Sequence, residues 1–305
     1  MGRPKIVTMR NLLRFGLCCA LLALSLHAQT PDSNPNGNQW TDPALDNAKA
    51  EAAFKPIAHP GLPTLWLIGD STVRNGDGQG KGGQWGWGDE LDPFFQIDKM
   101  NVVNRALGGR SSRTYYRDHW SRVLAQVQRG DVILMQFGHN DSGPLDDKAR
   151  ARGTLKGTGD ETQEIDNPIT RKHEVVHSYG WYLRQFVRET KAKGAIPVIC
   201  SPIPRKTWDE TTGKIHRDQY GTWAHEVAEQ EHVAFLDLNE AIARVYDAMS
   251  HEAVEKLFAD PHTHTSLEGA QLNARIVVST LRALNPDPVR PWLSKEGDSV
   301  PAYHP

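Results

Sequence analysis

The chain has 305 residues, of which 38% are hydrophobic and 24% are charged, and its formal net charge at pH 7 is -2. This composition is typical of a soluble globular protein and excludes a largely disordered chain. The sequence has neither a basic excess nor an acidic tail, so we expect no nucleic-acid partner and no partner bound mainly through charge.

The amino terminus has the pattern of a secretory signal peptide. Basic residues, among them Lys5, Arg10 and Arg14, precede an apolar run at 15–26, and Ala28 follows it closely. The run is shorter than the roughly 20 residues of a membrane-spanning helix. We therefore predict a signal peptide at 1–28, cleavage after Ala28 and no membrane association of the mature protein. A buried core helix is the alternative interpretation. The prediction implies a secreted or periplasmic protein, and the sequence does not distinguish the two.

The cysteines indicate a mature chain without an internal disulfide. Cys18 and Cys19 lie in the predicted signal peptide, which leaves only Cys200. Cys200 ends the apolar run 196–200, so we interpret it as a buried strand residue rather than a nucleophile.

Short apolar runs alternate with helical patterns after a polar segment at 29–61, which we interpret as a linker or surface wrap. In most of the apolar runs, apolar residues do not alternate with polar ones, which is typical of parallel strands buried on both faces. The pattern predicts one doubly wound α/β domain at 62–284, with helices on both sides of a parallel sheet. We predict strands at 65–68, 101–103, 131–136, 196–200 and 233–236, and helices at 85–95, 117–128, 173–193 and 267–284, with further helices after the last two strands.

Two segments depart from this alternation. The polar stretch 142–170 follows a predicted strand directly, so we expect a long functional or mobile loop over the active edge of the sheet. The proline-rich tail 285–305 has no helical period, and we expect it to lie extended on the surface.

Four segments with reactive side chains follow predicted strands or precede the last predicted helix. Ligands bind at the carboxyl ends of the strands in an open α/β sheet, so we expect these segments to meet at one edge. The segments are 69–72 (GDST), 104–114 (NRALGGRSSRT), 137–141 (FGHND) and 260–265 (DPHTHT).

Together these segments contain the groups that an acyl-transfer site needs. Such a site combines a nucleophilic hydroxyl, a base, a group that orients the base, and donors for the oxyanion. Ser71 is the candidate nucleophile, His264 the base and Asp260 its orienting group. The backbone N–H groups of Ser71 and Gly109 and the side-chain amide of Asn140 are the candidate oxyanion-hole donors.

Each segment also has a simpler interpretation. Residues 69–71 are typical of an ordinary turn or a helix N-cap, and Gly108-Gly109 of a plain turn. Asp260, His262 and His264 are residue types that bind metals. His139 and Asn140 are suited to capping a helix after a strand. We predict no metal, because no separate third set of ligands stands out and a metal would leave the serine of the first segment without a role.

The order of the four motifs resembles that of the SGNH, or GDSL-type, hydrolase superfamily. Within it, Gly-Arg-Ser-Ser-Arg-Thr followed by Gly-His-Asn-Asp is similar to the rhamnogalacturonan acetylesterases of carbohydrate esterase family 12. The similarity spans roughly 64–284. It implies a flavodoxin-like α/β/α fold, no metal or other cofactor, and release of acetate from acetylated galacturonate in pectin backbones.

The resemblance also implies residue roles. Ser71 takes the place of the nucleophile and His264 that of the base, while Gly109 and Asn140 take those of oxyanion-hole donors. The acid departs from the pattern, because the family spaces its acid and base as Asp-x-x-His and Asp260 lies four residues before His264. A backbone carbonyl as the orienting group, or His262 as the base, therefore stays open.

Several basic side chains are candidates for contact with an acidic polysaccharide. Arginine pairs with a planar carboxylate through two parallel hydrogen bonds. We expect Arg110, Arg113, His139 and His262 to bind substrate, with Arg205 close to the same edge, although the arginines are equally suited to packing their own loops.

The sequence thus predicts a secreted serine esterase that removes O-acetyl groups from a plant cell-wall polysaccharide or oligosaccharide, with rhamnogalacturonan favoured by resemblance. The alternatives are an esterase acting on acetylated xylan, small acetylated sugars or lipid esters, and a carbohydrate-binding domain with a degraded site. The sequence does not predict the oligomeric state.

Overall fold

The computed structural model describes residues 2, 48–49 and 51–305. The predicted signal peptide and most of the predicted linker therefore lie outside the described residues. Within the described part of the chain, no helix combines the length and the hydropathy needed to span a bilayer.

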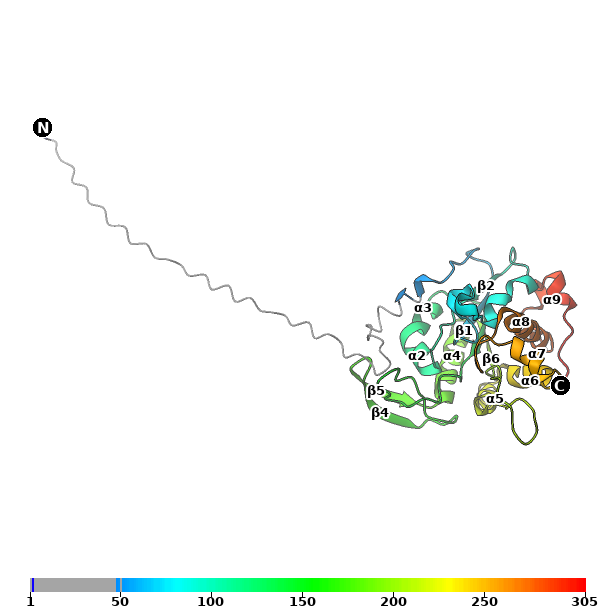
Figure 1. Ribbon diagram of the computed structural model, residues 1–305. Coiled ribbons are helices and arrows are strands. Elements are labelled where there is room, and N and C mark those ends of the chain that lie inside the picture. The colour runs from blue at the N-terminus through cyan, green and yellow to red at the C-terminus, as the bar shows by residue number, and fades with distance from the viewer. Residues whose placement is uncertain (1, 3–47, 50) are drawn as a thin grey trace. The chain divides into compact units, whose positions relative to one another are not determined.

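A five-stranded parallel sheet forms the centre of the domain (Figure 1). Its strand order is β2-β1-β3-β6-β7, and every pair of neighbours is parallel. The short apolar runs of the sequence coincide with these strands, because both faces of each central strand are buried. The strands are β1 (Thr64–Gly69), β2 (Asn101–Asn104), β3 (Val132–Gln136), β6 (Ile196–Cys200) and β7 (Ala234–Leu236).

Alternate residues of β1 contribute to two separate hydrophobic clusters. Leu65 and Leu67 pack on one side of the sheet, and Trp66 and Ile68 pack on the other. The predicted three-layer α/β/α arrangement is confirmed. The first cluster includes residues of α6 (Leu238–Asp247) and α8 (Leu267–Arg282), and the second includes residues of α2 (Ser112–Tyr115), α4 (Tyr179–Ala192) and α5 (Gln219–Glu231).

Shorter elements complete the domain. They lie mainly in the connections between strands and helices (Figure 1). They are the helical turns η1 (Gly76–Gly78), η2 (Lys81–Gly83), η3 (Trp87–Glu90), η4 (Asp92–Phe94), η5 (Tyr116–Trp120) and η6 (Arg290–Trp292), the helices α3 (Ser121–Leu124), α7 (His251–Lys256) and α9 (Lys295–Ser299), and the strands β4 (Thr162–Asn167) and β5 (Lys172–His177).

The prediction of a helix at 85–95 is wrong. This segment holds only the 3-10 turns η3 and η4. The backbone N–H groups of Trp87 and Gly88 donate to the carbonyls of Thr72 and Val73, which leaves them unavailable for a helix ladder. The segment thereby packs directly against the turn that follows β1.

The helix expected at 117–128 begins earlier. It starts at Ser112, because Ser111 and Thr114 form a reciprocal capping box, and it passes through the π-helical turn η5 before ending at Leu124. The amino end of α2 lies beside the segment 137–141, because Ser112 donates to Asp141.

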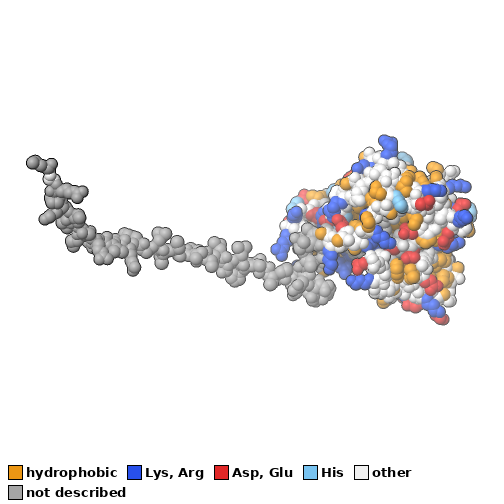
Figure 2. Space-filling model, turned by 90° about the horizontal axis from the view of Figure 1, so that it is seen from above, with side chains coloured by type: hydrophobic (Ala, Val, Ile, Leu, Met, Phe, Trp, Pro, Cys, Tyr) orange, Lys and Arg blue, Asp and Glu red, His pale blue; other side chains and the backbone are white. Residues whose placement is uncertain are grey.

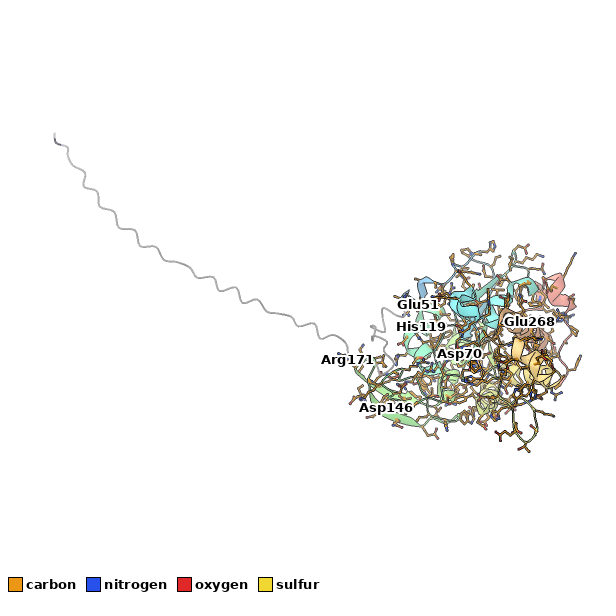
Figure 3. The ribbon with its side chains drawn as sticks, in the orientation of Figure 1. Glu51, Asp70, His119, Asp146, Arg171 and Glu268 are labelled. Atoms are coloured by element: carbon orange, nitrogen blue, oxygen red, sulfur yellow. The ribbon has the colours of Figure 1, made fainter. Side chains whose placement is uncertain are left out.

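The polar stretch 142–170 is not a continuous loop. It contains β4, which pairs antiparallel with β5, and Figure 3 labels Arg171 in the turn between them. The helix expected at 173–193 consequently begins only at Tyr179, with Ser178 as its N-cap. The hairpin was not evident from the sequence because its residues are mostly exposed and its apolar alternation is weak.

The tail 285–305 is not extended on the surface. It forms η6 and α9, and Val289, Leu293 and Val300 are buried in the cluster that includes α6 and α8. Cys200 is buried at the end of β6, as expected, and burial raises the pKa of its thiol.

A buried ion pair joins α2 to the hairpin. The side chain of Arg113 is fully buried, and its Nε and Nη2 atoms each donate to one carboxylate oxygen of Glu174 on β5, both at 2.8 Å. Its Nη1 donates to the carbonyls of Leu145 and Gly153. Arg113 therefore holds the hairpin and the stretch before it against the domain.

We predict that Glu174→Ala lowers the free energy of unfolding by about 3 kcal/mol, because it leaves the Arg113 guanidinium buried without its counter-charge. Chemical denaturation measures this change. Glu164→Ala, on the exposed neighbouring strand, is the matched control and should shift stability by less than about 0.5 kcal/mol. Equal effects of the two substitutions would contradict the assigned role of the ion pair.

Candidate active site

Ser71 lies in a tight turn immediately after β1. The N–H groups of Val73 and Arg74 both donate to the carbonyl of Asp70, which closes the turn around the serine. Gly69 is required there, because a Cβ on it would lie 2.6 Å from the carbonyl oxygen of Gln136 on β3. Ser71 is nearly buried, with 8% of its surface exposed, so its hydroxyl occupies a defined position at the strand end.

The structure brings His264 and Asp260 to this hydroxyl. The Nε2 atom of His264 lies 2.9 Å from the Oγ of Ser71, and its Nδ1 lies 2.5 Å from the Oδ2 of Asp260. The ring therefore bridges hydroxyl and carboxylate, which is the arrangement of a base with its orienting group. His262 is exposed, and its Nδ1 faces the Oγ1 of Thr263 instead.

The four-residue spacing is accommodated because the chain folds around the Asp260 carboxylate. The backbone N–H groups of His262, Thr263 and His264 all donate to its Oδ1, at 2.7 to 3.1 Å. Partial burial raises the pKa of Asp260, but these backbone hydrogen bonds and the one with the His264 ring outweigh that effect and hold the pKa well below its usual range. The group that faces the imidazole is therefore a carboxylate across the physiological pH range.

A short bridge fixes the base segment against the serine turn. Trp85 and Thr265 pair through two hydrogen bonds, one from the Trp85 N–H to the Thr265 carbonyl and one from the Thr265 hydroxyl back to the Trp85 carbonyl. The N–H of Ala259 donates to the carbonyl of His264. These contacts restrict the ring of His264 through the backbone on both sides of it.

The segment 104–114 brings candidate oxyanion donors close to the serine. A Cβ built on Gly108 would lie 3.7 Å from the Cβ of Ser71, so the segment 104–114 passes directly beside the hydroxyl. Gly109 has a φ of 74°, a conformation that favours glycine. No hydrogen bond within the described part of the chain uses the N–H of Ser71 or of Gly109. Both are therefore available to a ligand.

Asn140 is the third candidate donor. Its Nδ2 donates to the carbonyl of Arg110 at 2.9 Å, which uses one of the two amide hydrogens and leaves the second. The amide thus joins the segments 104–114 and 137–141 while retaining a donor.

His139 is buried behind the site rather than exposed to substrate, which corrects the expected role. Its Nδ1 lies 3.2 Å from the Oδ2 of Asp70 and its Nε2 lies 2.9 Å from the carbonyl of Ile203. A carbonyl only accepts, so Nε2 carries a hydrogen. Asp70, labelled in Figure 3, is fully buried. Burial raises the pKa of Asp70, but the charge of His139 and the hydrogen bonds from His139 and Thr72 outweigh it and lower the pKa.

Asp141 anchors α2 to the same segment. Its Oδ1 accepts hydrogen bonds from the backbone N–H of Ser112 at 3.1 Å and from the Ser112 hydroxyl at 2.5 Å. Burial raises the pKa of Asp141 to about 7, against the opposing effect of the Ser112 hydrogen bonds. These contacts fix the position of the neighbouring Asn140.

Arg205 connects the base segment to the Asn140 segment. Its Nη2 donates to the carbonyl of His139 at 2.9 Å, and its Nη1 donates to the Oγ1 of Thr263 at 2.5 Å. Arg205 follows β6, the strand next to β3. In the sequence, this position after a strand was the only indication that Arg205 lies near the site. The structure assigns it a bridging contact.

Arg110 and Arg113, which were also expected to bind substrate, contact groups of the protein instead. The Nε of Arg110 donates to the Nε2 of His119 at 3.2 Å, so its guanidinium is directed along its own loop and helix. Arg113 is fully buried on Glu174, which removes it from the candidate substrate contacts.

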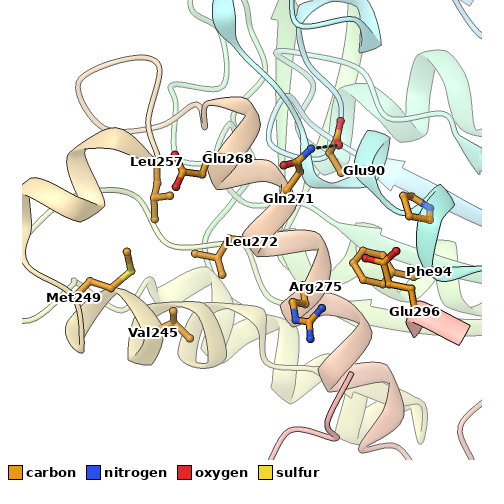
Figure 4. Close-up of a pocket in the computed structure, with 11 residues that line it drawn as sticks. Glu90, Phe94, Val245, Met249, Leu257, Glu268, Gln271, Leu272, Arg275 and Glu296 are labelled. Atoms are coloured by element: carbon orange, nitrogen blue, oxygen red, sulfur yellow. Dashed lines mark hydrogen bonds between the residues drawn. The ribbon is translucent and has the colours of Figure 1, made fainter. Parts of the chain in front are cut away.

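The described residues contain no group of three or more His, Cys, Asp or Glu side chains arranged to hold a metal ion. A pocket of about 670 Å³ lies between α6, α8 and η4 (Figure 4). None of the candidate site residues lines it, and the Glu90–Gln271 hydrogen bond crosses one side of it. The candidate site is therefore distinct from this pocket.

Comparison with known proteins gives the family. The model of the GDSL-like lipase/acylhydrolase family matches residues 67–272, which includes all four segments of the site. The chain belongs to this family. It is accordingly an ester hydrolase.

Named relatives extend over most of the domain. The chain is 30% identical over 228 residues to a rhamnogalacturonan acetylesterase of Emericella nidulans, covering 73% of this chain and 87% of that protein. It is 26% identical over 227 residues to a probable rhamnogalacturonan acetylesterase of Bacillus subtilis, covering 72% and 93%. The crystal structure of the Bacillus subtilis protein YxiM is similar in fold, with a TM-score of 0.58 and 24% identity over 72% of this chain and 56% of that one.

We predict that Asn140→Ala lowers kcat by roughly 10²- to 10³-fold, the usual effect of removing one oxyanion donor. Steady-state hydrolysis of p-nitrophenyl acetate measures the change, and circular dichroism verifies that the variant is folded. Asn140→Asp keeps the size of the side chain but places a carboxylate beside the oxyanion, so it should lose at least as much. A kcat within a factor of about three of wild type in either variant would rule out Asn140 as a donor.

Proposed function

We propose that this chain is a serine esterase that removes O-acetyl groups from a plant cell-wall polysaccharide, with rhamnogalacturonan as its main substrate. The observation that supports it best is the continuous hydrogen-bonded series from the Ser71 hydroxyl through the His264 ring to the Asp260 carboxylate. The N–H groups of Ser71 and Gly109 make no hydrogen bond within the described residues, and the two-glycine turn passes beside Ser71. This arrangement supplies every group that acyl transfer requires.

In the proposed reaction, the Oγ of Ser71 attacks the acetyl carbonyl carbon while His264 Nε2 takes the hydroxyl proton. The carbonyl π electrons move to oxygen, and the N–H groups of Ser71 and Gly109 and the Asn140 amide bind this oxyanion. Collapse of the tetrahedral intermediate breaks the bond to the sugar oxygen, which receives the proton from His264. Water then attacks the acetyl-serine by the same route, giving acetate and free Ser71.

Asp260 contributes by orienting the ring. Its carboxylate accepts the Nδ1 hydrogen of His264, which leaves Nε2 as the basic nitrogen, and it stabilises the imidazolium that forms during attack. The three backbone hydrogen bonds on Asp260 keep it ionised and fixed in place.

The names of the relatives support a carbohydrate substrate. Two relatives that match most of the domain are named as rhamnogalacturonan acetylesterases, one of them as probable. The stretch 142–160, which follows the Asn140 segment, is mostly polar and charged, which favours a polar polymer over a lipid ester. The face of the molecule drawn in Figure 2 likewise has basic, acidic and hydrophobic side chains interspersed. Because plant cell walls lie outside the producing cell, we also propose that the predicted signal peptide directs export.

We predict that the wild-type protein releases acetate faster from acetylated rhamnogalacturonan than from acetylated xylan, and that Ser71→Ala releases none from either. Ser71→Ala should keep the wild-type melting temperature, since the hydroxyl contributes little to the core. An enzyme-coupled acetate assay with matched acetyl contents makes the comparison.

Ser299→Ala is the control, because Ser299 is exposed on α9 and bonds only its own helix. Faster release from xylan would overturn the substrate assignment. Persistent release by Ser71→Ala would overturn the mechanism.

A further inference from the structure

Arg152 lies beside the proposed oxyanion hole. Its Nη1 donates to the carbonyl of Gly109 at 3.0 Å, and a Cβ built on Gly109 would lie 3.6 Å from the same nitrogen. Gly108 in turn passes beside Ser71. The guanidinium is therefore separated from the nucleophile only by the two-glycine turn, and the residue is partly exposed.

The charge of Arg152 has no carboxylate partner among the described residues. The acidic groups that act on it electrostatically include Asp141 and Asp70, and other donors already occupy these carboxyls. Ser112 donates to Asp141, while Thr72 and His139 contact Asp70. Only one hydrogen bond from the guanidinium is made within the described chain, whereas the group has five N–H hydrogens.

A partly buried cation without a counter-charge is unfavourable. Burial, together with the neighbouring charge of Arg150, lowers the pKa of Arg152 to about 10. The group stays charged at neutral pH. An anion that arrives with the substrate would supply the missing partner, and it would bind at the position where a sugar ring attached to the reacting ester has to lie.

The other arginines around the site are already engaged. Arg113 is buried on Glu174, and Arg110 is directed toward His119. Arg205 donates through both Nη atoms to the two segments that it bridges. Arg152 thus has the greatest unused hydrogen-bonding capacity of the four.

We propose that Arg152 binds the carboxylate of the acidic sugar that carries the acetyl ester, and so makes the enzyme selective for an acetylated uronate over an acetylated neutral sugar. This inference rests on the proposed function, because it assumes that the ester is presented at Ser71. Arginine forms two parallel hydrogen bonds with a planar carboxylate, which would also fix the orientation of the ring beside the oxyanion hole.

The test measures binding without turnover. Rhamnogalacturonan oligosaccharides freed of acetyl groups are titrated calorimetrically into the wild-type protein, and the same oligosaccharides are titrated after methyl esterification of their carboxyl groups. The wild type should bind the acid form at least about 10-fold more tightly, the usual effect of a hydrogen bond to a charged group. Arg152→Gln should bind both forms equally weakly, and Arg152→Lys should recover part of the preference.

Arg150→Gln is the matched control, because it removes the same charge from an exposed position two residues away and should keep the preference. Equal binding of both forms by the wild type, no binding of either form, or a preference that survives in Arg152→Gln would overturn the inference. Failure of the proposed function is seen separately, as a lack of acetate release from acetylated rhamnogalacturonan by a protein that still binds the acid form.

Discussion

The hydrogen bond between Ser71 and His264 is the contact on which the candidate site depends. It joins residues 193 positions apart in the chain, so neither residue can reach the other unless the whole sheet has formed. β1 brings the serine to the carboxyl edge, and the turn before α8 brings the imidazole. The parallel sheet brings the two segments to the same edge. The loops then determine the distance between the Ser71 oxygen and the His264 nitrogen.

Those loops are held by buried polar contacts as well as by hydrophobic packing. Asp70, next to the nucleophile, contacts His139, next to the proposed amide donor, and the His139 ring continues to the chain after β6. Arg205 links the backbone of His139 to Thr263, within the turn that presents His264. Ser71, Asn140 and His264 therefore each have a neighbour in sequence that is fixed to another segment. A displacement of one segment would be transmitted to the others, and this explains why interior positions beside the site hold charged residues.

The parallel sheet and the layers that cover it could be predicted from the sequence. Runs such as 65–68 and 131–136 could be read as buried parallel strands because an apolar side chain at every position is stable only between two covering layers. Three of the four reactive segments could be placed at one edge because they follow strand ends, and the fourth because it precedes the closing helix. The contact of Asp260 with His264 was predicted with a backbone carbonyl left as the alternative, because spacing alone does not show a chain folding around a carboxylate.

The errors have a common physical cause. Arg113 and His139 are charged or polar types that usually contact solvent, and nothing local to their sequence indicates the partners, Glu174 and Asp70, that allow burial. The β4–β5 hairpin and the buried tail likewise depend on tertiary contacts that leave little periodicity in the sequence.

The central claim is that the imidazole of His264 activates the hydroxyl of Ser71. The most direct measurement is the rate at which a fluorophosphonate probe modifies the protein, with the modified residue located by mass spectrometry. The account predicts covalent labelling of Ser71 in the wild-type protein and labelling slower by at least about 10²-fold in His264→Ala, because the serine then lacks its general base. Labelling at a different residue, or equal rates in the two proteins, would contradict it.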